Sequence, residues 1–200
     1  MTALADLKTR IADEIDRTDA ASQIANAITT AIRAYKFNRF AFNEGSEILT
    51  TLSGLSEYSE AGGLPTGILQ IDTARITINA SSRYLLEHVA YSEIDRMDTS
   101  STYTSRPIWY AWHEQKLRLY PTPNDAYVIT LRYLADIDEE DWCTYAEALV
   151  RCRAKRDLYT HWLFDSQMAA MMAQAEADEL RALKREAMLK QSSGRIVPHD

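Results

Sequence analysis

The segment from Pro107 to Tyr133 carries the only long strand pattern in the sequence. Near its end, alternate positions are aromatic or aliphatic, at Tyr127, Ile129, Leu131 and Tyr133. A period of two with β-branched and aromatic residues is typical of a strand that buries one face. The segment therefore predicts three consecutive strands, a three-stranded antiparallel meander at about 107–134.

Two polar stretches supply the turns of this meander. Residues 114–116 are Glu, Gln and Lys, which suit a hairpin between the first two strands. Residues 121–125 contain two prolines, which cannot donate hydrogen bonds to a neighbouring strand, followed by Asn and Asp. We expect this second stretch to form a stiff loop that ends the second strand.

Apolar residues at helical spacing predict the remaining body of the protein. The predicted helices are at about 3–16, 19–36, 83–97, 142–164 and 166–191. Weaker alternation predicts further strands at about 47–51 and 68–78. The expected fold class is therefore α+β and mainly helical. It is a helical bundle with a small antiparallel sheet, in one domain over residues 1–191, followed by an extended C-terminal arm at 192–200.

Charge and hydropathy limit the classes of function. The formal net charge of −7 disfavours a protein whose task is to grip nucleic acid, because phosphate contacts need a basic surface. No apolar run approaches the ~20 residues that cross a bilayer, and the first residues show no signal-peptide pattern. We therefore expect the protein to be cytosolic when it is made.

The sequence offers no motif for catalysis. The four histidines lie on separate predicted elements without ligand spacing: His88, His113, His161 and His199. Nucleophile motifs and glycine-rich phosphate loops are missing as well. We therefore expect no catalytic, cofactor-binding or metal-binding residues. The acids at 138–141 could hold a hard cation, but acids also favour the start of a helix, which is the preferred interpretation.

Two surface patterns each allow two interpretations. Trp109, Tyr110 and Trp112 could stack on bases of single-stranded nucleic acid, although few basic residues lie beside them, which favours a core or subunit interface. The second pattern is the basic run of one predicted helix, at Arg151, Arg153, Lys155 and Arg156. It spreads around the helix, which favours a solvated or inter-subunit face over phosphate contact.

Short motifs follow one another along the chain between about residues 20 and 165. They are Ala27, Ile28, Ala31 and Ile32; Arg39 to Glu44; Thr50, Thr51, Gly54, Glu57 and Tyr58; Leu64, Pro65, Ile68 and Ile71; Pro107, Trp109 and Tyr110; Leu117 to Pro123; and Tyr127, Ile129, Leu131 and Tyr133. Their order resembles that of the head-to-tail adaptor proteins of tailed bacteriophages, also called tail accessory or head-completion proteins. That family usually has a glycine in the hairpin turn where this chain has residues 114–116.

The resemblance implies a structural protein of the virion and no enzyme. It implies a ring, commonly of twelve copies, that docks under the portal protein and contacts a downstream tail protein, either a nozzle, a stopper or a tail tube. The ring would form part of the channel, where double-stranded DNA passes without sequence-specific contact. Its place would be the neck of the virion, after assembly in the cytoplasm of the host bacterium. Two other classes stay open: a monomeric nucleic-acid-binding module, and a metal-dependent enzyme that uses residues 138–141.

The C-terminal arm is the predicted binding segment. Arg195, Ile196, Val197 and Pro198 follow a Ser-Ser-Gly sequence that uncouples them from the last helix. They have too little apolar surface to fold alone, and they suit an extended strand or a groove filler on another protein. The resemblance implies a groove on the portal, with Arg195 at an acidic site. The alternative is a frayed terminus without a role.

Overall fold

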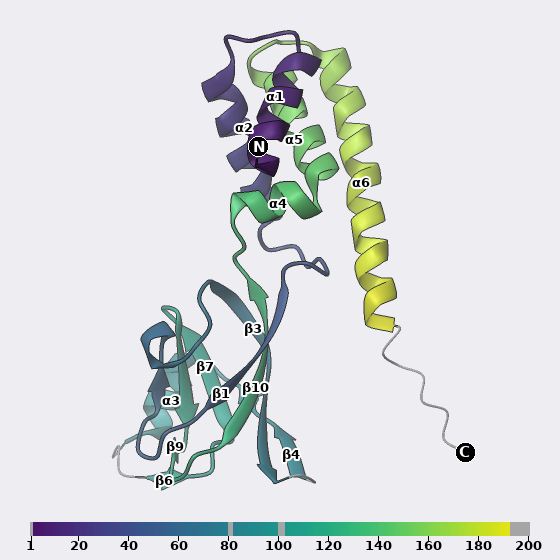
Figure 1. The fold of residues 1–200 in the computed structure, drawn as a ribbon. Coiled ribbons are helices and arrows are strands. Elements are labelled where there is room, and N and C mark those ends of the chain that lie inside the picture. Colours follow the sequence, from purple (N-terminus) through teal and green to yellow (C-terminus); the bar gives the residue numbers. More distant parts are fainter. Residues whose placement is uncertain (1, 80–81, 100–102, 193–200) are drawn as a thin grey trace, which may run out of the picture. The chain divides into compact units, whose positions relative to one another are not determined.

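The computed structural model describes residues 2–79, 82–99 and 103–192, which form two compact units (Figure 1). The helical unit is built from residues 1–43 and 137–200, so it uses both ends of the chain. The sheet unit is residues 44–136. Among the described residues, 45% are helical and 27% lie in strands.

The helical unit contains α1 (Ala3–Glu14), α2 (Ala21–Tyr35), α4 (Glu139–Tyr145), α5 (Glu147–His161) and α6 (Ser166–Ser192). The apolar spacing explains the core. Ile24, Ile28 and Ile32 recur every four residues and bury one face of α2. They share one hydrophobic cluster with residues of α1, α4 and α5, among which Trp142 is the largest.

In its described residues, 44–79, 82–99 and 103–136, the sheet unit contains ten strands and a short helix. They are β1 (Glu44–Thr50), β2 (Glu57–Tyr58), β3 (Ile68–Asn79), β4 (Ser82–Leu85), β5 (Glu87–His88), β6 (Thr104–Ser105), β7 (Trp109–His113), β8 (Lys116–Tyr120), β9 (Thr122–Pro123) and β10 (Val128–Ala135), with α3 (Tyr91–Met97) between β5 and β6 and a 3₁₀ turn at Glu60–Gly62. The larger sheets have the strand orders β1-β10-β3-β4 and β2-β8-β7-β5, while β6 and β9 form a parallel pair. One hydrophobic cluster contains buried residues of both larger sheets.

Strand β10 is the centre of the first sheet. It pairs antiparallel with β1 on one side and with β3 on the other, and Leu131 lies opposite Glu47 and Ala74. Ile129 and Leu131 are fully buried, whereas Val128 and Arg132 on the opposite face are exposed. The alternation predicted for this strand is therefore present.

The prediction of a mainly helical fold with a small sheet is wrong, because three sheets build a whole unit. The segment at 107–134 is not a three-stranded meander either. Strands β7 and β8 form a hairpin in one sheet, while β10 lies in another. The two prolines explain the difference: the connection at 121–127, which includes the two-residue strand β9, leads the chain out of the hairpin instead of returning beside it.

Two predicted helices also differ from the structure. Residues 83–97 begin with β4 and β5, and only Tyr91–Met97 is helical. The helix predicted at 142–164 is two helices, α4 and α5, with a break at Ala146. The prediction for 83–97 depended on Leu85, Val89 and Ile94 at near-helical spacing. Three such residues are too few to separate a helix from short edge strands, because edge strands expose much of their surface.

The turn between β7 and β8 is made by Glu114 and Gln115, whose φ angles are 49° and 59°. Two consecutive left-handed residues characterise the type I′ turn, which matches the twist of a hairpin and favours Asn-Gly. Neither Glu nor Gln is suited to this conformation, because their Cβ atoms crowd the backbone there. The pairing of β7 with β8 on either side therefore has to offset the strain in this turn.

We expect Leu131→Asp to unfold the sheet unit, because it places an unpaired carboxylate at a fully buried position between two strands. The expected loss in free energy of unfolding exceeds about 4 kcal/mol. Thermal melts followed by near-UV circular dichroism measure it. Val128→Asp, on the exposed face of the same strand, is the control and should cost about 1 kcal/mol or less. A Leu131→Asp protein that melts like the parent would refute the facing of β10.

We expect Gln115→Gly to stabilise the protein by about 0.5–1 kcal/mol, because glycine adopts a positive φ without strain. The strain that is relieved in the folded state exceeds the entropy cost of the more flexible glycine in the unfolded chain. Urea unfolding measures the change. Lys116→Gly, one residue further and inside β8, should instead destabilise by a similar amount. If both glycines destabilise equally, the turn is not under strain.

Candidate functional site

The acidic run at 138–141 caps helices. Asp138 accepts a hydrogen bond from the backbone N–H of Asp141 at 2.8 Å and so caps α4. The carboxylate of Glu140 accepts hydrogen bonds from the backbone N–H groups of Ala3 and Leu4, the first residues of α1. Carboxylates at these positions satisfy free N–H groups and oppose the positive end of the helix dipole.

The remaining acids of this run point in other directions. Glu139 accepts a hydrogen bond from the Thr29 hydroxyl at 2.8 Å, and Asp141 lines a hollow in the surface. The four carboxylates therefore do not converge on one point. Within the described residues, no group of three or more potential ligands could hold a metal ion. The helix-start interpretation accounts for these residues.

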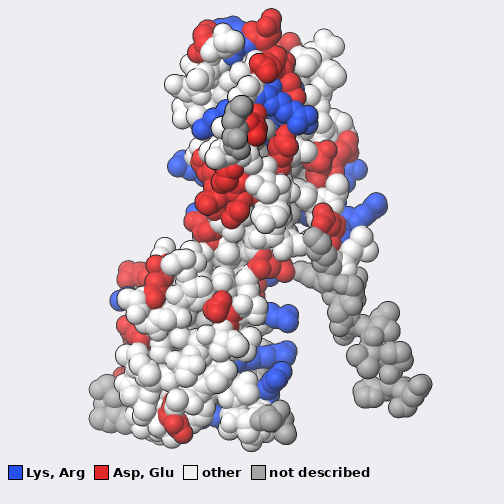
Figure 2. Space-filling model, in the orientation of Figure 1, with Lys and Arg blue, Asp and Glu red and all other residues white. Residues whose placement is uncertain are grey.

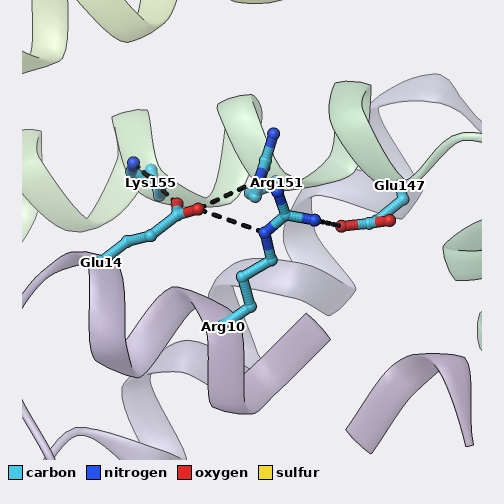
Figure 3. Close-up of polar contacts among 5 residues, drawn as sticks. All are labelled: Arg10, Glu14, Glu147, Arg151 and Lys155. Atoms are coloured by element: carbon cyan, nitrogen blue, oxygen red, sulfur yellow. Dashed lines mark hydrogen bonds and ion pairs between the residues drawn. The ribbon is translucent and has the colours of Figure 1, made fainter. Parts of the chain in front are cut away.

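The basic run of α5 is paired within the helical unit. The carboxylate of Glu14 at the end of α1 lies 3.0 Å from Arg151 and 2.9 Å from Lys155 (Figure 3). Arg10 contacts the same carboxylate at 3.3 Å and reaches Glu147 at 2.8 Å. Partial burial raises the pKa of Glu14, but the hydrogen bond from Lys155 and the nearby positive charges lower it more, so its pKa is below its ordinary value.

The other two cations of this run lie around a buried carboxylate on α6. Glu176 is 7% exposed and lies 2.7 Å from Arg156 and 3.3 Å from Arg153. The Tyr35 hydroxyl of α2 donates a hydrogen bond to the same carboxylate, and both burial and this bond raise the tyrosine pKa. This polar joint attaches α6 to α5 and α2. The run at 151–156 is therefore not a free basic surface for phosphate.

The aromatic residues of β7 belong to the sheet unit's own packing. Tyr110 is 2% exposed and part of the core, and Trp112 packs against that core. The Trp109 ring stacks on Tyr120, with centroids 6.0 Å apart, and its indole N–H donates to Glu87 at 3.1 Å. The core interpretation is therefore favoured over a platform for unpaired bases.

A hollow of about 430 Å³ lies on the helical unit. Its lining is aromatic and acidic, with Phe40, Ala41, Phe42, Asp141, Tyr145, Leu183 and Glu186. The Phe42 ring stacks on Tyr145, with centroids 5.6 Å apart, while Tyr145 stays 57% exposed. Such a lining can accept an apolar or cationic side chain of a partner protein. Sequence reasoning missed it, because three separate segments build it.

A second hollow lies on the sheet unit and has a basic lining. Arg75, Arg83 and Arg132 come from three different strands, which pair side by side. Their spacing in sequence gives no sign of this grouping, and only the register of the sheet places them on one face. The predicted arm residues Arg195, Ile196, Val197 and Pro198 lie outside the described residues.

Comparison with known proteins identifies the family. The chain matches the family model described as SU10 adaptor protein over residues 2–198. No curated protein matches the chain. None of the helices in the described ranges has the length and apolar content to cross a membrane. The chain therefore belongs to the SU10 adaptor protein family, which confirms its resemblance to the head-to-tail adaptors of bacteriophages.

Proposed function

We propose that this protein is the subunit of a ring that docks under the portal, connects it to the next tail protein and surrounds part of the DNA path. The observation that carries the proposal is the family match over residues 2–198. It includes both units, so the adaptor role applies to the chain as a whole. The ring belongs in the neck of the virion and assembles in the host cytoplasm. Twelve copies are the number that the resemblance implies.

The way in which charged groups are used supports a structural role. An enzyme built on residues 138–141 would need carboxylates that are free to bind a metal or move protons, but Asp138, Glu139 and Glu140 accept hydrogen bonds within the helical unit. A nucleic-acid-binding module built on α5 would need free cations there. Those cations lie against Glu14 and Glu176 instead.

Exposed apolar residues on the first sheet support contacts between copies. Strands β1 and β4 are the outer strands of that sheet. Ile48 on β1 and Leu85 on β4 are 61% and 62% exposed. Contacts between two different edges of neighbouring subunits are heterologous, and such contacts form a closed ring when the rotation per subunit closes. Edge strands also offer free backbone groups to a partner.

The C-terminal arm is proposed to bind the portal. Residues 193–200 follow α6 and include one arginine and two β-branched residues. An extended segment of this kind gains its affinity from main-chain hydrogen bonds and from a few side chains in pockets. An interface supplied partly by a short terminal segment would make association of free copies weak, so the ring would need the portal as a template.

We expect the purified chain to be monomeric or weakly associated and to form a ring only with a portal present. The portal holds many copies at high local concentration, which offsets the cost of ordering. Native mass spectrometry and negative-stain electron microscopy, with and without the candidate portal, measure the stoichiometry. A stable closed ring of the chain alone at micromolar concentration contradicts the template requirement.

We expect deletion of residues 192–200 to abolish portal binding while the melting temperature changes by less than about 2 °C, because the deletion removes only the last residue of α6 and the residues that follow it. Pull-down with the portal measures binding. The paired variants Ile196→Asp and Val197→Asp test the apolar anchors, and His199→Ala serves as the control. Full binding by the truncated chain would exclude the arm and direct attention to the hollow at Phe42 and Tyr145.

A further inference from the structure

One face of the first sheet is rich in arginine and threonine. The residues that line its hollow of about 190 Å³ are Thr73, Arg75, Thr77, Arg83, Thr130 and Arg132, and we call this the Arg–Thr face. Its position follows from the alternation of the strands, because Ala74, Ile76, Ile129 and Leu131 occupy the opposite, buried face. In Figure 2, blue side chains follow one another down the side of this unit where Figure 1 places β10 and β4.

The three arginines form a diagonal row across three neighbouring strands. Arg132 of β10 lies opposite Thr73 of β3, and Arg75, two residues further along β3, lies opposite Thr130. Arg83 of β4 lies opposite Thr77, again two residues further. Diagonal neighbours in an antiparallel sheet are about 7–8 Å apart. The Cα atoms of the three arginines therefore follow a diagonal line with nearly regular spacing.

These arginines stand out in an acidic environment. Residues 44–136 contain seven Lys and Arg against twelve Asp and Glu. Arg118 is paired with Asp95 and Asp98. By contrast, Arg75, Arg83 and Arg132 are exposed and make no ion pair with any residue in the described part of the chain. Three like charges in a row repel one another unless an anion lies between them.

The chemistry of the face selects its ligand. Guanidinium and hydroxyl groups are the side chains that most often contact phosphate oxygens of nucleic acids. The lining of the hollow has no carboxylate to repel a phosphate. A row of regularly spaced cations fits a linear polyanion better than it fits a single carboxylate. It offers no amide in the hollow to read a base edge.

We propose that the Arg–Thr face binds the phosphodiester backbone of double-stranded DNA without reading its sequence. This rests on the ring function proposed above, in which the face would line the channel in every subunit. The net charge of −7 does not prevent such contact, because at physiological ionic strength charges are screened beyond about 8 Å. Three contacts per subunit give weak binding with a slope of log K against log salt of about −2.7. Weak contacts hold DNA centred and still let it slide.

The test uses the full chain and a fluorescent 20-base-pair duplex of mixed sequence. Anisotropy titrations from 20 to 200 mM salt compare the parent with R75Q/R83Q/R132Q. The matched control is R33Q/R96Q/K116Q, which removes three exposed charges elsewhere and gives the same net charge. We expect the first variant to bind at least tenfold more weakly at 20 mM salt and to lose most of the salt slope, while the control binds within twofold of the parent. Equal losses in both variants would overturn the proposal.

The side-chain Nε–Hε signals of arginine in NMR spectra give a second, residue-specific readout. The duplex should shift the signals of Arg75, Arg83 and Arg132, each assigned through its Arg→Lys variant, but not that of Arg118. If polyglutamate shifts these signals and the duplex does not, the face binds an acidic protein and the proposal fails.

Portal binding by R75Q/R83Q/R132Q separates this inference from the proposed function. If R75Q/R83Q/R132Q still binds the portal but no longer contacts DNA, the result supports both the ring function and the DNA-binding face. If the parent itself does not bind the portal, the ring function fails, whatever the DNA titration shows. If the variant loses portal binding or ring formation but keeps its DNA affinity, the face is a protein interface, and this inference fails while the ring function stands.

Discussion

The antiparallel pairing of β1 with β10 is the contact on which both units depend. Glu44, the first residue of β1, lies opposite Leu134 near the end of β10. The sheet unit is inserted between two parts of the helical unit, and this pairing brings the two ends of the insertion together. Because those ends are adjacent, the described residues 2–43 and 137–192 can share one core. If β1 and β10 were not paired, the two ends of the inserted sheet unit would lie apart.

Within the helical unit, nearly all the charge that looked functional serves the fold. The acids at 138–141 replace the hydrogen bonds that the first turns of α1 and α4 lack. The cations of α5 are neutralised by Glu14 and Glu176. Charges that are used in this way fit a subunit whose task is to hold the positions of other proteins. In the function proposed above, recognition is assigned to the hollows, the edge strands and the C-terminal arm.

The sequence was informative where a pattern is local. The alternation of β10 and the four-residue spacing of α2 were both readable, because burial of one face imposes a period on the chain. The sheets were underestimated for the opposite reason. Strands such as β1, with Leu49 as its single buried residue, carry little alternation, and their partners are distant in sequence. The basic face had no local sign either, because it depends on a register between β10, β3 and β4.

The resemblance to adaptors was visible because a family shares an order of motifs even where each motif is weak. The resemblance could not give the exact bounds of the helices or the way in which they pack. The break between α4 and α5, for example, comes at Ala146, in a sequence with no proline or glycine to mark it. The hollow at Phe42 and Tyr145 likewise depends on how α6 packs beside α4 and residues 40–42, and no short motif encodes that packing.

The polar joint at Glu176 fixes the register of α6. This helix has 27 residues and so extends for about 40 Å. A shift of one helical turn would move Glu176 about 5.4 Å away from Tyr35, Arg153 and Arg156 and leave its buried carboxylate without these partners, which is far costlier than a slip between apolar surfaces. The position of α6 along α5 and α2 is therefore fixed, and so is the distance from these contacts to the end of the helix. The end of α6, where the arm proposed to bind the portal begins, then lies at the same distance from the helical core in every copy.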